Sequence, residues 1–163
     1  MRITLKNNLR VLSFHIVGTI LMFLCLWYFK FADEAILIFG CFWVLYTLPA
    51  FYLHIEYYLK NRGEAIEINP NEIIVRRNGK EIKRYSSNEL EEISVYKSAS
   101  LDRGGIQILA LESYHYARIL TKTKEEIIIT CLLTPKVEEA VKQLRGVEYF
   151  RYKVFFATLK LKW

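Results

Sequence analysis

The stretch "WYFKFADEAILIFG", residues 27–40, places Lys30, Asp33 and Glu34 between two apolar runs. Residues 11–29 before this charged break contain no Asp, Glu, Lys or Arg, and neither do residues 35–53 after it. At a rise of about 1.5 Å per residue, each run is close to the roughly 20 residues that cross a bilayer core. The sequence therefore predicts an N-terminal transmembrane helical hairpin with spans at about 11–29 and 35–53.

Two other interpretations of these runs are weaker. A cleaved signal peptide would suit the basic start "MRITLKNNLR", but the run exceeds the usual core of about 7–15 residues. A cut after Ala32 would also place Lys30, rather than a small residue, at the third position back. A buried pair of soluble helices is disfavoured because both runs are apolar on all faces.

The basic residues predict the orientation of the hairpin. Three cations precede the first run and two follow the second, whereas the loop carries one Lys against two acids; the flanking cations are Arg2, Lys6, Arg10, Lys60 and Arg62. Positive-inside counting then places both termini in the cytoplasm. Tyr52, Tyr57 and Tyr58 are expected near the inner membrane surface.

After Gly63, which we expect to end the second helix, the pattern changes to short segments rich in Ile, Val, Tyr and Thr. Seven strands are predicted, at 65–69, 72–77, 80–85, 91–97, 105–112, 115–121 and 125–132. Asn78-Gly79 predicts a two-residue type I′ hairpin between the second and third. A helix is expected over 134–146, with Thr134 as N-cap and Pro135 in its first turn.

This order resembles that of bacterial membrane proteins of the YcxB-like and bacterial PH-like kind. The resemblance rests on "AIEINPNEIIVRRNGKEIKRYSSNELEEISVY", residues 65–96, and on "TPKVEEAVKQL", residues 134–144. It implies an α+β membrane protein of the bacterial inner (cytoplasmic) membrane. Residues 1–63 would form the hairpin and stalk, and 64–163 a PH-like seven-stranded antiparallel β-barrel with a C-terminal amphipathic helix.

A tail, "VEYFRYKVFFATLKLKW", follows that helix at residues 147–163. Its end alternates apolar and polar residues from Phe155 onward, which predicts an extra C-terminal strand. A membrane-surface segment and a strand that docks a partner are the alternatives.

Few groups suited to catalysis are found. The histidines are His15, His54 and His115, and the cysteines are Cys25, Cys41 and Cys131. No P-loop, nucleophile elbow or zinc-protease motif accompanies them. His15 and His54 could approach each other, but two ligands do not close a metal site. We expect no enzyme, no metal, no cofactor and no disulfide.

The clearest candidate site is a cluster of cations around the Asn78-Gly79 turn, which we call the basic hairpin. Its residues are Arg76, Arg77, Lys80, Lys83 and Arg84. Near an anionic leaflet each cation would contribute about 1 kcal/mol; the alternative is a solvated hairpin that protects a sheet edge. PH-family phosphoinositide sites usually use the preceding hairpin. Nucleic acid is not expected, because residues after Gly63 include 17 basic against 14 acidic side chains.

The sequence thus predicts a non-enzymatic membrane protein whose cytoplasmic PH-like module binds a protein partner or anionic lipid. The alternative is an immunity protein that shields its producer from a membrane-active or cytoplasmic toxin, which would be its partner.

Overall fold

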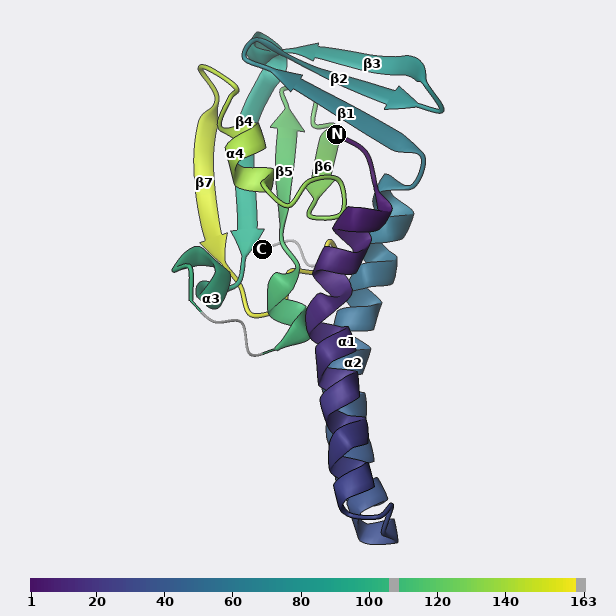
Figure 1. Ribbon diagram of the computed structural model, residues 1–163. Coiled ribbons are helices and arrows are strands. Elements are labelled where there is room, and N and C mark those ends of the chain that lie inside the picture. Colours follow the sequence, from purple (N-terminus) through teal and green to yellow (C-terminus); the bar gives the residue numbers. More distant parts are fainter. Residues whose placement is uncertain (106–108, 161–163) are drawn as a thin grey trace.

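The computed structural model describes residues 1–105 and 109–160, and is dominated by two long antiparallel helices that project from an α+β body (Figure 1). α1 (Leu5–Tyr28) and α2 (Asp33–Asn61) are joined by a tight turn in which Lys30 and Phe31 have φ of 51° and 56°. Thr4 caps α1 by accepting a 3.2 Å hydrogen bond from the Asn7 amide. Both helices are long and apolar enough to be candidate membrane spans.

The described residues after α2 contain seven strands, which agrees with the α+β class; six lie where strands were predicted and the seventh lies in the tail. They are β1 (Glu64–Asn69), β2 (Glu72–Arg77), β3 (Lys80–Ser86), β4 (Leu90–Lys97), β5 (Tyr116–Thr121), β6 (Glu126–Thr130) and β7 (Glu148–Lys153). Short helical segments lie between them: η1 (Ser87–Glu89), α3 (Ala99–Asp102), η2 (Ala110–Ser113) and α4 (Val137–Val141). The change from helix to strand occurs around Gly63, whose φ of +74° ends α2 as expected.

The described strands form two sheets rather than one continuous barrel. One has the order β1-β2-β3, and the other has the order β6-β5-β4-β7. Every pairing is antiparallel except that of β7, which runs parallel to β4. A wholly antiparallel seven-stranded barrel was therefore the wrong prediction for the sheet topology.

The prediction of a strand at 105–112 was also wrong for its described residues, 105 and 109–112. Ala110 and Leu111 are consecutive and both buried, a pattern that a strand with one solvent face does not produce. They belong to the helical turn η2, which packs against both α1 and α2. The Glu112 carboxylate holds this turn by accepting hydrogen bonds from the Leu109 amide and the Ser100 hydroxyl at 3.1 and 2.7 Å. Residues 106–108 lie outside the described part.

The end of the chain differs from its prediction as well. The helix expected over 134–146 is regular only over α4, which Lys136 precedes without a side-chain cap. The extra strand is β7, at Glu148–Lys153, and the described residues 155–160 form no strand. Ala157 and Thr158 are adjacent and both buried, because this segment packs against α2 instead of alternating between two faces. Residues 161–163 lie outside the described part.

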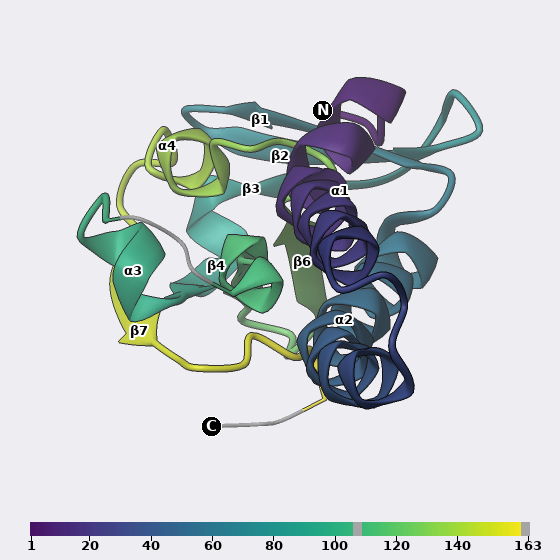
Figure 2. The same cartoon turned by 60° about the horizontal axis from the view of Figure 1, so that its bottom comes forward.

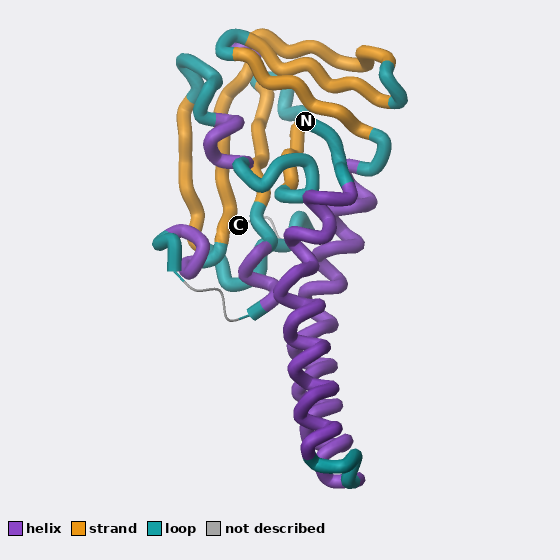
Figure 3. Tube along the Cα trace, in the orientation of Figure 1, coloured by secondary structure: helices purple, strands orange, loops and turns teal. Residues whose placement is uncertain are grey.

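The hydrophobic core joins the helices to the sheets. Val11 from α1 and Ala50, Leu53 and Tyr57 from α2 belong to the same buried cluster as the strand residues. The hairpin is therefore a structural part of the body and not a detachable tether, as the continuous helices in Figure 3 illustrate. Figure 2 shows both helices lying along one side of the body.

Candidate functional site

The basic hairpin forms as its sequence predicted. Asn78 and Gly79 both have positive φ, 52° and 80°, which is the requirement of a type I′ turn between β2 and β3. The cations project from exposed positions on these strands. The structure therefore brings the five predicted residues together on one hairpin.

Four of these cations have acidic partners on the same surface. Arg76 contacts Glu67 at 3.3 Å, Arg77 contacts Glu64 at 2.8 Å, Lys83 contacts Glu125 at 2.6 Å, and Arg84 contacts Glu72 and Glu81 at 3.2 and 3.1 Å. Within the described residues no ion pair involves Lys80. Such exposed pairs add little stability, but they neutralise much of the positive field that the sequence suggested.

The position of the basic hairpin also matters. The sheet β1-β2-β3 lies at the end of the body farthest from the α1–α2 turn (Figure 1). The cations of the basic hairpin consequently lie on the opposite end of the body from the one where α1 and α2 project. The sequence left open an approach of the Asn78-Gly79 turn to the membrane. That approach does not fit this geometry if α1 and α2 cross the same membrane.

A second charged cluster was missed by the sequence reasoning. Lys97 at the end of β4 contacts Asp102 at 3.1 Å and Glu138 at 2.5 Å, and Arg151 of β7 contacts both acids. The Lys97 and Asp102 side chains are only 11% and 7% exposed, so the pairing is largely desolvated. This network joins β4, α3, α4 and β7. The sequence did not indicate it, because Glu138 and Arg151 lie more than 40 residues after Lys97.

The pKa of Glu138 reflects this network. Burial alone would raise the pKa of its carboxyl, but hydrogen bonds from Lys142, Lys97 and Arg151 outweigh burial and hold the pKa well below its usual range.

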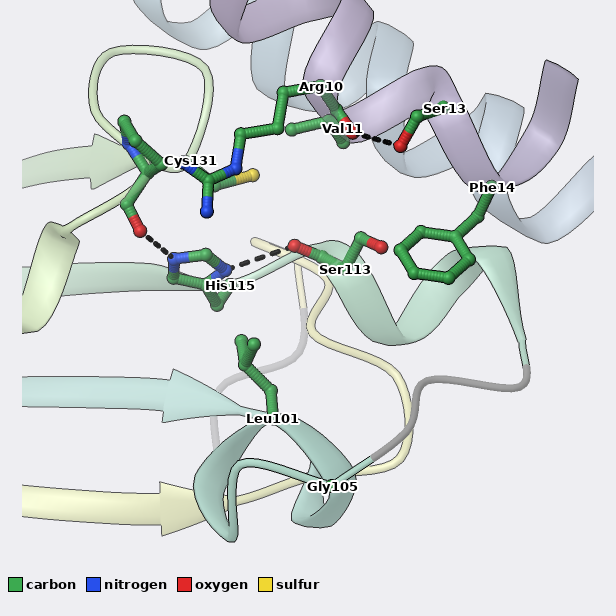
Figure 4. Close-up of a pocket in the computed structure, with 10 residues that line it drawn as sticks. Arg10, Val11, Ser13, Phe14, Leu101, Gly105, Ser113, His115 and Cys131 are labelled. Atoms are coloured by element: carbon green, nitrogen blue, oxygen red, sulfur yellow. Dashed lines mark hydrogen bonds between the residues drawn. The ribbon is translucent and has the colours of Figure 1, made fainter. Parts of the chain in front are cut away.

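A cavity of about 400 Å³ lies between α1 and the second sheet (Figure 4). Arg10, Ser13 and Phe14 line it from α1, and His115 and Cys131 line it from the strand side. The Arg10 side chain extends from the helix toward His115 and Cys131. Arg10 entered the sequence analysis only as one of the cations that predict the membrane orientation of the helices. No local pattern indicates that the start of β5 lies opposite Arg10.

The two reactive groups in this cavity are constrained. The His115 ring nitrogens contact backbone carbonyls, Nδ1 with Ser113 at 3.0 Å and Nε2 with Pro135 at 3.3 Å. Burial lowers the pKa of His115, and burial raises the pKa of the Cys131 thiol to about 12. Cys131 is 1% exposed, which suits a packed thiol better than a nucleophile.

The other histidines are packing residues. His15 stacks on Tyr46 with ring centroids 6.3 Å apart, and His54 Nδ1 lies 3.1 Å from the Tyr114 hydroxyl. Among the described residues there is no group of three or more His, Cys, Asp or Glu side chains that could hold a metal ion. The three cysteines are unpaired.

Comparison with known proteins gives one match. No curated protein and no solved structure matches the chain. A family model described as PH domain matches residues 2–142, a range that includes both long helices and ends at α4, before β7. Since the match covers most of the chain, the protein belongs to this PH domain family.

Proposed function

We propose that the protein is a non-enzymatic, membrane-anchored binding module. In this proposal the α1–α2 hairpin crosses the bacterial inner membrane from the cytoplasm and returns, and it holds the PH domain at the cytoplasmic surface, where the domain binds a protein partner or anionic lipid. The family match supports a binding module, and the hairpin supplies the anchor.

The exposed apolar surface of the hairpin carries the proposal. Only 11% and 17% of the residues in the most apolar windows of α1 and α2 are buried, whereas a core helix of a soluble protein would be mostly buried. Leu37 and Leu45, for example, are 68% and 72% exposed. At about 25 cal/mol per Å² of apolar surface, exposure of a whole helical hairpin to water would be costly. A bilayer removes that cost.

The non-enzymatic part of the proposal rests on the constraints at the cavity. A nucleophile needs an accessible, activated group and a nearby base. The Cys131 thiol is buried with a raised pKa, and His115 contacts a carbonyl through each ring nitrogen. The basic hairpin, at the far end of the body, is better placed for a cytoplasmic protein partner than for lipid.

Membrane extraction and a topology reporter test the anchor. The full chain should stay with membranes after alkaline carbonate treatment and be released by detergent. A reporter fused after Trp163 should be active only in the cytoplasm. Release by carbonate would refute the anchor, and a periplasmic signal would refute the orientation. A pull-down from native membranes would then identify the partner, with charge reversal at Arg76 and Lys83 expected to weaken its capture.

A further inference from the structure

The cavity between α1 and the second sheet contains a cation without a counter-ion. Arg10 is the only Lys or Arg among its described lining residues, and these include no Asp or Glu. No ion pair or side-chain hydrogen bond involves the Arg10 guanidinium within the described part of the chain. Lys97 and Lys142, by contrast, both contact Glu138. The Arg10 side chain is exposed, so water can hydrate its donors, and an anionic ligand in the cavity would replace that water with charge-assisted hydrogen bonds.

The other polar groups around Arg10 are already engaged. His115 contacts two backbone carbonyls, and the Ser13 hydroxyl donates to the Arg10 carbonyl at 2.7 Å. Arg10 is therefore the group best able to bind a ligand in this cavity. Its planar fork suits a phosphate, which accepts two parallel hydrogen bonds.

The same face of α1 continues with apolar side chains. Phe14, Val17 and Leu21 follow Arg10 at i+4, i+7 and i+11, a spacing that places them on one side of a helix. They are 38%, 54% and 56% exposed. A cation followed by an apolar stripe matches the chemistry of a phospholipid, whose phosphate is joined to acyl chains.

The height of Arg10 along the hairpin agrees with this ligand. Arg10 lies 18 residues before Tyr28, the last residue of α1, which corresponds to about 27 Å of helix. The hydrocarbon core of a bilayer is about 30 Å thick. With the α1–α2 turn at the outer surface, Arg10 would lie near the inner headgroups.

We propose that this cavity binds the phosphate group of an anionic phospholipid through Arg10, with the acyl chains following Phe14, Val17 and Leu21. This inference rests on the proposed membrane anchor. It places lipid recognition between α1 and the second sheet and not on the basic hairpin.

The test measures lipid binding to the full chain in detergent micelles by native mass spectrometry. Phosphatidylglycerol should bind about tenfold more tightly than phosphatidylcholine, a factor that corresponds to about 1.4 kcal/mol. Both lipids offer Arg10 a phosphate, but the choline cation of phosphatidylcholine cancels the net negative charge and opposes the guanidinium. Arg10→Gln should therefore remove the preference. Arg10→Lys, which keeps the charge without the fork, should retain part of it. Lys6→Gln is the matched control, because it removes one exposed cation of α1 that does not line the cavity.

Several results would overturn the inference. These are equal binding of the two lipids by the parent protein, an unchanged preference in Arg10→Gln, or an equal loss in Lys6→Gln. Displacement of the lipid by millimolar inorganic phosphate would assign the cavity to a soluble anion instead. Carbonate extraction distinguishes a failure of the lipid-binding proposal from a failure of the membrane-anchor proposal. A protein that stays in membranes but lacks the lipid preference refutes only lipid binding in the cavity.

Discussion

Asn61, at the end of α2, provides the sharpest test of how the hairpin is joined to the body. Its side chain is fully buried and contacts β6, an edge strand of the second sheet. The amide nitrogen donates to the Ile128 carbonyl at 2.9 Å, and the amide oxygen accepts from the Thr130 amide and hydroxyl at 3.3 and 2.7 Å. One side-chain amide thus pairs with an edge strand as a neighbouring strand would.

Replacing Asn61 with Ala would leave these buried groups without partners. An unsatisfied buried donor or acceptor costs about 1–3 kcal/mol, so losing the contacts to Ile128 and Thr130 should cost at least about 2 kcal/mol. A free-energy loss of 1 kcal/mol lowers Tm by about 2–4 °C in a chain of 163 residues. The expected decrease in Tm is therefore about 4 °C or more.

The assay is thermal unfolding of the full chain in detergent micelles, followed by circular dichroism, with hydrogen exchange of β6 as a local readout. Asn69→Ala is the control, because the side-chain amide of Asn69 donates, among the described residues, only to the Glu72 carboxylate, at 3.2 Å. That control should change stability by about 0.5 kcal/mol or less. If Asn61→Ala unfolds at the temperature of Asn69→Ala and β6 exchanges no faster, Asn61 does not protect the sheet edge.

Three further predictions concern other parts of the body. Gly79→Ala should destabilise the full chain by about 1–2 kcal/mol in thermal unfolding, because a side chain is strained at the φ of +80°; unchanged stability would contradict the turn type. Since the pKa of Glu138 is depressed, its contribution to stability is present above the unfolded pKa of about 4.3 and is lost as pH falls below that value. Tm should therefore fall less steeply on acidification in Glu138→Gln than in the parent, and parallel profiles would contradict this. N-ethylmaleimide should label Cys131 in urea but not in the native protein, as read by mass spectrometry, and native labelling would refute its burial.

Local sequence patterns predicted the parts of the fold that depend on neighbours in the chain. The charged break after Tyr28 and the apolar runs on either side specify the two helices, and Asn78-Gly79 specifies its own turn because few residue pairs adopt positive φ together. The same local reasoning identified the basic hairpin as a cluster. It could not show that acids from β1 and from the segment before β6 neutralise most of these cations.

The features that the sequence missed depend on distant contacts. The segment around Ala110 has the composition of a strand, but contacts with α1 and α2 favour a helical turn. β7 is exposed along most of its length, so its sequence lacks a clear alternation of apolar and polar residues. Its place in the sheet depends on pairing with β4 and on the ion pairs of Arg151. Tyr57, expected at the membrane surface, is instead fully buried and donates to the Ala157 carbonyl at 2.6 Å.

The described segment after β7 packs against α2 at the level where the body would meet a membrane. Phe156 stacks on Tyr52 of α2 with ring centroids 6.0 Å apart, and the Lys160 ammonium lies 5.7 Å from the centroid of the same tyrosine ring. Tyr52 is 19 residues after Asp33, about 28 Å along α2, which is the height estimated for Arg10 on α1. Phe155 is 73% exposed beside this contact. Aromatic rings and lysine side chains are favoured at the membrane–water boundary. The first part of the tail is thus the strand β7. For the described residues after β7, 154–160, we propose from this packing a position at the membrane surface.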